Sequence, residues 1–371
     1  MRLAVFFSRG MSLAGWRRAG IFDREIALYR ALLPQVEQLM FVTYGDRAEE
    51  SALASALPGV EILPNRWGLP SNLYSVLAPL LHWRALSRAT IFKTNQINGA
   101  WCAVIAKRLF GKKLVVRCGF LWSDFVARQH PGGWRQAAAR RLEQWAFRAA
   151  DLVIVATAAD RDAIVRRDRI DPARVQVISN SVDTALFRPM AEVAREPGRI
   201  TFVGRLDDQK NVGALIAALE GLQGATLVLV GNGPLRDCLQ SDAAKRGVDA
   251  TFLGTRPHAE LPALLNRSEV FVLPSHYEGN PKALLEAMAC GVPVVGADAP
   301  GIREIVAHRE NGYLTGSSPG EIRAALQDVL GDAALRERIS AGGVSYARAH
   351  CSLQIAVERE LALLIGLAAT A

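Results

Sequence analysis

Short apolar runs alternate with longer segments of helical periodicity along most of the chain. A short continuous apolar run predicts a buried strand, and apolar residues at every third or fourth position predict an amphipathic helix. Strands are therefore predicted in the first half at the runs RLAVFF, QLMFVTYG, TIFKTN, KKLVVRCG and DLVIVA. The series starts again in the second half with RITFVG, TLVLVG, DATFLG, EVFVLP and VPVVGA.

Regular alternation of apolar strands with helices is typical of parallel sheets covered on both faces, so the expected fold class is α/β. Two such series in 371 residues predict two Rossmann-like domains. We expect a first domain over residues 1–182, a Pro-containing linker over 183–199 and a second domain over 200–350. The last segment, 351–371, reads as a further helix.

The charge is distributed unevenly between the two halves. Residues 1–182 contain 26 Lys+Arg and 14 Asp+Glu, a net charge of +12, whereas residues 183–371 contain 18 and 22, a net charge of −4. All seven tryptophans lie in the first half. Such a half suits an anionic substrate or an anionic membrane surface. No nucleic-acid partner is expected, because no recognised motif accompanies the charge.

One helical segment of the basic half, WRQAAARRLEQWAFRAA, has a clear apolar stripe. Trp134, Ala138, Leu142 and Trp145 share one side of the predicted helix, and we expect them to pack on the sheet. The arginines and the other tryptophans are then available to a membrane surface. No apolar run approaches the roughly 20 residues of a spanning helix, and the N-terminal run is too short for a secretory signal. We therefore expect a cytoplasmic protein that can rest on the inner membrane.

The loops that follow the strands of the second domain carry the candidate chemistry, because open α/β sheets bind ligands at the carboxyl ends of their strands. GRLDDQKN places Arg205 and Lys210 beside a helix N-terminus, which suits a pair of phosphates. In GNGP, Gly231 and Gly233, on either side of Asn232, allow a tight turn and a close approach of the backbone. LGTRP begins at Leu253, and its backbone can hydrogen-bond the edge of a planar base.

The fourth loop lies in HYEGNPKALLEAMACG, where two glutamates stand eight positions apart. Asn280 is expected to cap a helix whose first residue is Pro281. Glu286 can accept hydrogen bonds from a vicinal diol such as a ribose, and Glu278 faces hydroxyls nearer a reacting carbon. Two roles are open for Glu278: it acts in the reaction, or it only binds a hydroxyl.

The E-x7-E pattern of Glu278 and Glu286, followed by EAMACGVPVV, resembles the signature of GT4-type retaining glycosyltransferases of the GT-B fold. VGRLDDQKN, LVGNGP, VISNSVDTALFRP and NGYL extend the resemblance over residues 151–315. It implies two Rossmann-like domains that face each other across a cleft, and a final helix that returns to the first domain. It also implies transfer of a hexose-type sugar from a UDP- or GDP-sugar, with retention and without a metal, to a polysaccharide-precursor or lipid-linked acceptor.

The loops and the resemblance together give ten candidate donor-binding residues, namely Gly10, Arg205, Lys210, Gly231, Asn232, Leu253, Glu278, Asn280, Lys282 and Glu286. Arg205 and Lys210 would hold the diphosphate and, with Glu278, take part in the reaction. Gly10, in the loop after the first strand, would meet the phosphates from the opposite domain. Glu278 and the backbone at 280 and 282 would contact the donor sugar.

The sequence departs from the family pattern at two positions. Cys118 stands where many relatives have a histidine near the reacting sugar, and His130 on a nearby loop is a candidate substitute. Ser181 replaces a usual glycine. No C-x-x-C pattern is present, and Asp207 and Asp208 of the Arg205 loop are adjacent rather than spaced as D-x-D, so neither a metal nor a bound cofactor is expected. Two alternatives are a nucleotide-sugar epimerase of the same fold and a non-catalytic sugar-binding protein.

Overall fold

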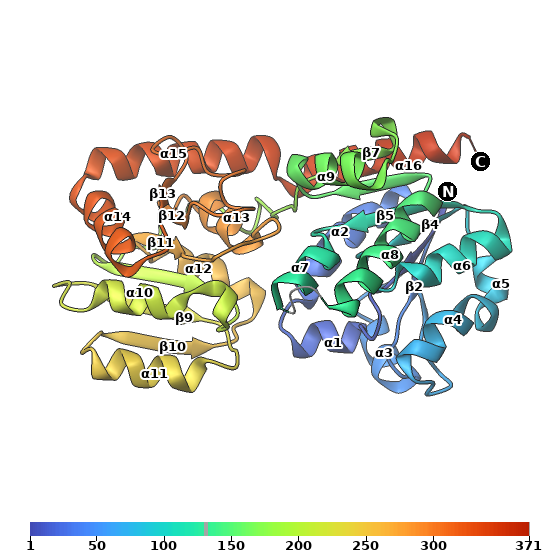
Figure 1. Cartoon of the computed structure of the whole chain (residues 1–371), viewed down its shortest axis with the longest axis horizontal. Coiled ribbons are helices and arrows are strands. Elements are labelled where there is room, and N and C mark those ends of the chain that lie inside the picture. Colours follow the sequence, from blue (N-terminus) through green and yellow to red (C-terminus); the bar gives the residue numbers. More distant parts are fainter. Residues whose placement is uncertain (130–132, 371) are drawn as a thin grey trace. The chain divides into compact units, whose positions relative to one another are not determined.

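The chain divides into two compact units, each built on one parallel sheet (Figure 1). The computed structural model describes residues 1–129 and 133–370. Unit 1 comprises Met1–Ser179 together with Ala356–Ala371, and unit 2 comprises Asn180–Ile355. Residues 183–199, expected as a linker, lie within unit 2.

The sheet of unit 1 has seven parallel strands in the order β3-β2-β1-β4-β5-β6-β7. The strands are β1 (Arg2–Phe6), β2 (Gln38–Val42), β3 (Val60–Leu63), β4 (Ile91–Thr94), β5 (Lys113–Cys118), β6 (Leu152–Val155) and β7 (Val175–Val177). In β1, Leu3 and Val5 belong to one hydrophobic cluster, and Ala4 and Phe6 belong to another. Because successive side chains of a strand point to opposite faces, the sheet is buried on both sides, as the continuous apolar runs predict.

Ten helices belong wholly or mostly to the described part of unit 1. They are α1 (Leu13–Arg18), α2 (Phe22–Leu32), α3 (Arg47–Ala54), α4 (Ser71–Leu81), α5 (Trp83–Leu86), α6 (Ala100–Phe110), α7 (Trp122–Gln129), α8 (Trp134–Ala149), α9 (Ala158–Asp168) and α16 (Leu353–Ala368). Ala356 and Leu364 of α16 join the same cluster as Leu3 and Val5. The end of the chain thus contributes to the core of the unit in which the chain begins.

The predicted apolar stripe of α8 is partly wrong: Trp145 packs against the core of unit 1, and Ala138 and Leu142 are half-buried, but Trp134 does not join them. The side of the helix that is buried carries Ala139, Glu143, Ala146 and Phe147, while Trp134 is 77% exposed. The buried side of α8 differs from the predicted one because Glu143, a charged residue, has partners inside the protein and therefore occupies a core position. Sequence periodicity ranks a glutamate as an exposed residue and cannot foresee those partners.

The sheet of unit 2 has six parallel strands in the order β10-β9-β8-β11-β12-β13. They are β8 (Arg199–Val203), β9 (Thr226–Val230), β10 (Ala250–Gly254), β11 (Val270–Leu273), β12 (Val294–Ala297) and β13 (Tyr313–Thr315). Its helices are α10 (Val212–Leu219), α11 (Arg236–Lys245), α12 (Leu261–Asn266), α13 (Lys282–Ala289), α14 (Pro319–Gly331) and α15 (Ala333–His350). The α/β class with two parallel sheets is therefore confirmed.

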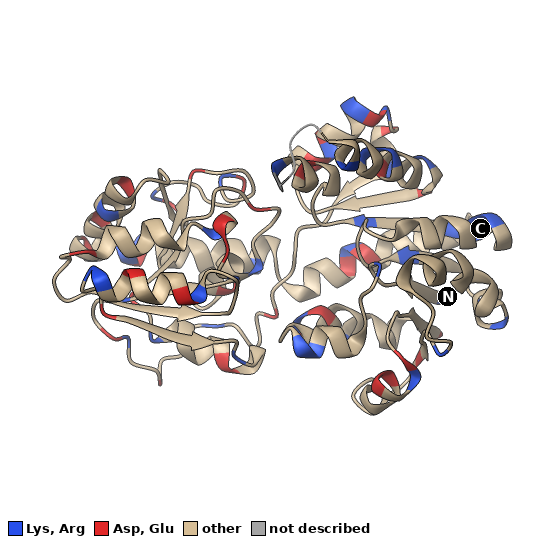
Figure 2. Cartoon of the chain, turned by 60° about the horizontal axis from the view of Figure 1, so that its bottom comes forward, with Lys and Arg blue, Asp and Glu red and all other residues tan. Residues whose placement is uncertain are grey.

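Both sheets reverse their strand order beside their first strand, between β1 and β4 and between β8 and β11. Ligands of open α/β sheets bind at such a reversal, at the carboxyl ends of the strands. Figure 2 shows that the strands are almost free of charged residues, which gather on the helices and loops. Within residues 1–129 and 133–370, no helix has the length and apolar character that crossing a bilayer requires.

His82, between α4 and α5, makes the stability of unit 1 depend on pH. Its ring Nε2 lies 2.9 Å from the hydroxyl of buried Tyr74. Burial, aided by the charge of Arg66, lowers the pKa of His82 from 6.5 to about 4. Because the unfolded chain binds a proton near pH 6.5 and the folded chain does not, the stabilisation is complete above that pH and is lost as the pH falls toward about 4. The full loss is about 3 kcal/mol.

Urea unfolding of the full chain at several pH values between about 7 and about 4 measures this effect. We expect His82→Gln to remove this part of the pH slope, whereas His350→Gln, which changes an exposed histidine, leaves it in place. An unchanged slope in His82→Gln would show that other groups cause the pH dependence.

Candidate active site

Two loops flank the point at which the sheet of unit 2 reverses its strand order. One follows β8 and contains the short 3-10 helix Asp208–Lys210, and the other follows β11. They are joined by hydrogen bonds: the backbone N–H of His276 donates to the Gln209 carbonyl (2.9 Å), and the Gln209 side chain donates to the Tyr277 carbonyl (2.8 Å). The GRLDDQKN and HYEGNP motifs, far apart in sequence, therefore form one edge.

Lys210 and Glu278 meet at this edge. Nζ of Lys210 lies 2.6 Å from Oε1 of Glu278, and the two side chains are only 17% and 8% exposed. A lysine ammonium has three donors and a carboxylate accepts at two oxygens, so each group can hold the other and a ligand at once. The pairing also fixes a cation at the carboxyl ends of the strands, where open α/β sheets bind ligands.

Arg205 has a different environment. Its side chain is 72% exposed, and its guanidinium lies 2.9 Å from a carboxylate oxygen of Asp207. The loop after β8 thus carries both predicted cations, but each is held by its own carboxylate. Lys210 is the fixed cation of the site, and Arg205 is a solvent-exposed one.

The two glycines of the GNGP loop allow neighbouring loops to approach closely. Gly231 has a φ of +132°, and a side chain there would collide with the Gly204 carbonyl; one at Gly233 would collide with the backbone of Leu206. The Leu206 N–H donates to the Asn232 carbonyl (3.0 Å), and the Gly231 N–H donates to the Gly254 carbonyl (2.9 Å). Gly231 and Asn232 therefore tie the loops after β8, β9 and β10 together.

Leu253 marks an irregularity in β10. The register to β9 shifts between Phe252 and Gly254, so Leu253 is the extra residue of a β-bulge. Its side chain is half-buried against the core of unit 2. A bulge takes the backbone of its extra residue out of the regular ladder, which is the arrangement that a backbone contact to a base edge needs.

Glu286 is buried rather than exposed to solvent. It projects from α13, is 2% exposed, and its Oε1 lies 3.0 Å from Nε2 of His258. The His258 ring in turn packs against Phe187 with 4.9 Å between ring centroids. The sequence analysis missed His258, because a single histidine in LGTRPHAE has no pattern of its own. The imidazole orients the carboxylate that was expected to bind a diol.

The predicted cap of α13 by Asn280 is wrong. The helix begins at Lys282 after Pro281, and no side chain caps it. The Asn280 side-chain oxygen instead accepts from the Asn180 backbone N–H (3.1 Å), and the Asn180 side chain donates to the Asn280 carbonyl (2.7 Å). This reciprocal contact fixes the loop before α13 to the first residue of unit 2.

Gly301 is a second residue that the sequence analysis missed. It has a φ of +83°, and a side chain there would collide with the backbone of Glu278 and Gly279. The Glu278 N–H also donates to the Pro300 carbonyl (2.8 Å). The loop after β12 therefore supports the backbone of Glu278 from behind, and only a glycine at 301 permits the contact.

A cavity of about 1070 Å³ lies elsewhere in unit 2. It is lined by Arg195 and Glu269, near the starts of β8 and β11, and by Arg336 and Ser340 of α15. Lys210 and Glu278 lie in the loops that follow the opposite ends of those strands. We place the candidate site at the carboxyl ends, because the strand order reverses there and the charged pair lies there.

In unit 1, Gly10 lies in the loop after β1, and Cys118 is the last residue of β5. Gly10 is exposed and has a φ of +77°, which favours glycine. Cys118 is fully buried, its Sγ lies 3.1 Å from the Phe120 carbonyl, and burial raises the pKa of its thiol. A buried neutral thiol cannot supply the charge of a histidine. His130 lies outside the residues that the structure describes.

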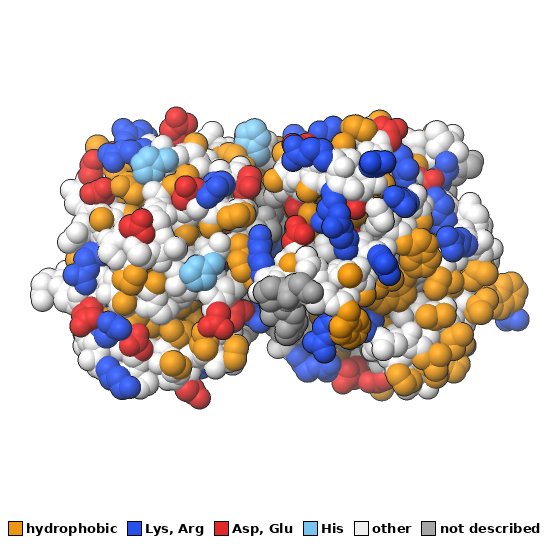
Figure 3. Space-filling model, in the orientation of Figure 1, with side chains coloured by type: hydrophobic (Ala, Val, Ile, Leu, Met, Phe, Trp, Pro, Cys, Tyr) orange, Lys and Arg blue, Asp and Glu red, His pale blue; other side chains and the backbone are white. Residues whose placement is uncertain are grey.

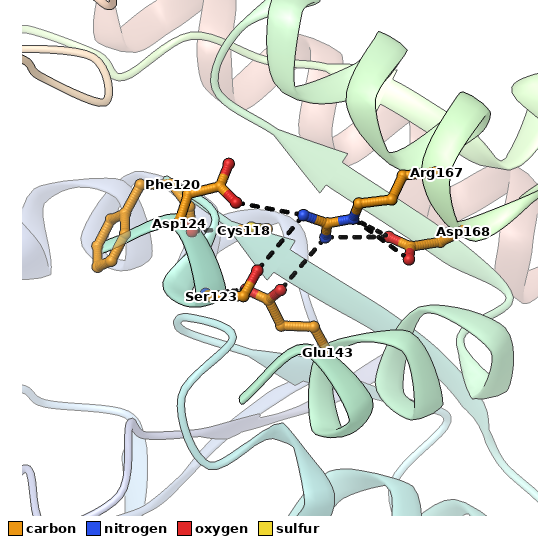
Figure 4. Close-up of polar contacts among 7 residues, drawn as sticks. All are labelled: Cys118, Phe120, Ser123, Asp124, Glu143, Arg167 and Asp168. Carbon is orange, nitrogen blue, oxygen red and sulfur yellow. Dashed lines mark hydrogen bonds and ion pairs between the residues drawn. The ribbon is translucent and has the colours of Figure 1, made fainter. Parts of the chain in front are cut away.

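The first turn of α7, which follows Cys118 closely, is held by a partly buried charge network (Figure 4). The Ser123 N–H donates to Glu143 (2.9 Å), and the Arg167 guanidinium reaches Glu143 and Asp124 (3.3 Å each) and Asp168 (3.1 Å). Burial raises the pKa of Glu143, and the contacts to Ser123 and Arg167 oppose that rise. The network ties the start of α7 to α8 and to the end of α9.

Solved structures share this fold over the whole chain. HepE of Anabaena in complex with UDP has a TM-score of 0.81 and 21% identity, and covers 99% of this chain and 100% of that one. Sucrose-phosphate synthase from Thermosynechococcus elongatus has a TM-score of 0.82 and 21% identity over 100% of both chains. The fold is that of the GT-B glycosyltransferases.

Two family models match consecutive parts of the sequence. Residues 27–186 match Glycosyltransferase Family 4, and residues 186–345 match Glycosyl transferases group 1. The chain therefore belongs to the group 1, or family 4, glycosyltransferases, as its motifs indicate.

The curated relatives are glycosyltransferases as well. Glycogen synthase of Mycobacterium tuberculosis (strain ATCC 25618 / H37Rv) is 36% identical over 220 residues, which are 56% of this chain and 53% of that enzyme. The chain spans about half the length of the curated relatives that it matches. These relatives agree with the family that the two models give.

Proposed function

We propose that this glycosyltransferase moves a hexose-type sugar from a UDP- or GDP-sugar to a polysaccharide-precursor or lipid-linked acceptor at the inner membrane face, with retention at the anomeric carbon. The observation that carries the proposal is the Lys210–Glu278 pair at the strand-order reversal of unit 2. The fixed cation can offset the charge of a leaving diphosphate. The acid beside it can accept a hydrogen bond from a sugar hydroxyl. The complexes of HepE with UDP and with UDP-glucose support a nucleotide-sugar donor, and favour UDP.

The proposed chemistry divides the site into three parts. Lys210 and Arg205 offset the negative charge that grows on the diphosphate as the sugar leaves, so the proposal requires no metal ion. Glu286, oriented by His258, accepts hydrogen bonds from the ribose hydroxyls. The bulged backbone at Leu253 reads the edge of the base.

The donor sugar lies against the loop before α13 in this proposal. Glu278 accepts from its hydroxyls, and the backbone of Asn280 and Lys282 lines the same side. Gly10 approaches the phosphates from unit 1, because a glycine lets the backbone come close to a ligand. The roles of Gly231 and Asn232 follow from their contacts: they hold the loops in register around the ligand.

Calorimetric titration with UDP, GDP and ADP tests the donor site. We expect the wild-type chain to bind one of the three clearly better than the others. Glu286→Gln should weaken that binding about 10- to 100-fold, because a charge-assisted hydrogen bond to the ribose becomes a neutral one. Glu260→Gln is a matched control, since Glu260 is exposed and lies two residues from His258.

Three results would contradict the proposal. Binding of a free sugar with no binding of any nucleoside diphosphate would indicate a sugar-binding protein. Equal losses in Glu286→Gln and Glu260→Gln would remove Glu286 from the donor site. Conversion of a nucleotide-sugar into an isomer, with no acceptor present, would indicate an epimerase.

A further inference from the structure

Helix α4 exposes an apolar side to solvent. Leu73, Val76 and Leu80 are 47%, 48% and 56% exposed and follow one another at three- and four-residue spacing, so they lie on one side of the helix. The opposite side, with Tyr74 and Ala78, is fully buried. The helix is therefore anchored in the core by its opposite side, and this anchoring does not need the exposed apolar side.

Two tryptophans flank this side of α4. Trp67, just before the helix, is 38% exposed, and Trp83, at the start of α5, is 55% exposed. Each carries an arginine on its ring: Arg66 lies 4.4 Å from the ring centre of Trp67, and Arg84 lies 5.7 Å from that of Trp83. Figure 3 shows hydrophobic side chains gathered over α4, α5 and α6.

All charged residues in the segment around α4 are basic. Residues 62–123, which contain α4, α5 and α6, include nine Lys+Arg and no Asp or Glu. Some of these cations are engaged within unit 1: buried Lys93 pairs with Glu360, Lys107 with Asp151, and Arg88 with Glu61. Arg66 and Arg84, in contrast, are exposed and lie over the rings of Trp67 and Trp83.

We propose that a surface formed by Arg66, Trp67, Leu73, Val76, Leu80, Trp83 and Arg84, the α4–α5 surface, docks on a bilayer that contains anionic lipids. Tryptophan rings suit the level of the lipid headgroups, leucine and valine side chains suit the acyl region below it, and arginines bind lipid phosphates. A nucleic acid would match the arginines but not the three aliphatic side chains, so a lipid surface fits the whole set. The inference rests on the proposed transfer to a membrane-bound acceptor, for which it names the surface that holds the enzyme there.

Co-sedimentation of the full chain with vesicles tests the surface. Vesicles of phosphatidylcholine mixed with phosphatidylglycerol should retain the wild-type chain at low ionic strength, and added salt or phosphatidylcholine alone should weaken the retention. A Leu80→Ser/Trp83→Ala variant should partition about tenfold less well or worse, because two apolar groups no longer enter the bilayer. Arg66→Ala/Arg84→Ala should lose the preference for the anionic lipid.

Trp134→Ala is the matched control, because Trp134 is exposed on α8 beside an arginine but lies outside the α4–α5 surface. Its partition should equal that of the wild type. The inference is overturned if the wild-type chain does not sediment with anionic vesicles, or if the Leu80→Ser/Trp83→Ala variant sediments as well as the wild type. It is also overturned if the chain forms a dimer that this variant abolishes, since the surface would then be a protein interface.

Calorimetry with UDP separates this inference from the proposed function. All three variants change exposed side chains of unit 1, so their affinity for UDP should equal that of the wild type. A variant that loses vesicle binding but keeps its affinity for UDP supports the surface independently of the donor site. Intact vesicle binding in a chain that binds no nucleoside diphosphate would count against the donor site and leave the surface standing.

Discussion

Replacing Lys210 with alanine is expected to lower kcat for cleavage of the nucleotide-sugar about 100- to 1000-fold, the size of effect seen when one fixed donor to a developing anion is removed. Lys210 is the cation that the structure holds in place, because Glu278 lies 2.6 Å from its Nζ. Steady-state hydrolysis and transfer rates with the preferred donor measure the effect. Arg205→Ala should cost less, since that side chain is 72% exposed and less firmly positioned.

Two further variants separate lost catalysis from lost structure. Lys245→Ala removes an exposed lysine of α11 and should leave kcat unchanged. Lys210→Ala/Glu278→Gln removes the unpaired carboxylate that the single variant leaves, so it should restore stability without restoring kcat. A Lys210→Ala enzyme within about threefold of the wild-type rate would show that Lys210 does not stabilise the leaving group.

Replacing Glu360 with alanine is expected to destabilise unit 1 by about 3–5 kcal/mol, because it leaves a buried cation without its partner. Glu360 of α16 and Lys93 of β4 are each 1% exposed, and Nζ of Lys93 lies 2.5 Å from Oε1 of Glu360. Burial lowers the pKa of Lys93, and Glu360 opposes that change. Urea unfolding at neutral pH measures the loss.

The Lys93→Met/Glu360→Leu variant should recover most of this stability, because an apolar pair needs no buried charge compensation. Glu358→Ala, which changes an exposed glutamate of the same helix, should have little effect. If Glu360→Ala were as stable as Glu358→Ala, the ion pair would not be what fixes α16 to the sheet of unit 1.

Most strands that the sequence predicts are buried on both faces, whereas the predicted strand β10 is a partly exposed edge strand. Runs such as RLAVFF and EVFVLP stand out because every position after the first is apolar, and they form β1 and β11. Three short strands were not predicted, namely Val60–Leu63, Val175–Val177 and Tyr313–Thr315. Each lies at the edge of its sheet, where one side meets solvent and polar residues enter the strand.

Helix ends and buried helix faces also depend on contacts that apolar spacing does not predict. The pattern over residues 72–88 reads as one helix, but the structure breaks it at His82 into α4 and α5. The break places His82 against Tyr74, a contact that apolar spacing does not encode. The burial of Glu143 in α8 is a second case, because its partners Ser123 and Arg167 are 20 and 24 residues away.

In the candidate site, residues in loops after strands were the easiest to find. Lys210 and Glu278 were selected because parallel strands bring such loops to one edge, and the structure places the two side chains in contact. Contacts between distant segments were not foreseeable. Asn280 bonds to Asn180 instead of capping its own helix, and Glu286 has His258 as a partner 28 positions away.

A crystal structure of the chain with UDP tests the central proposal most directly. We predict diphosphate oxygens within hydrogen-bonding distance of Lys210 Nζ and a ribose hydroxyl on the Glu286 carboxylate, at the carboxyl ends of β8 and β11. UDP bound at the opposite ends of those strands, in the cavity lined by Arg195 and Arg336, would contradict it.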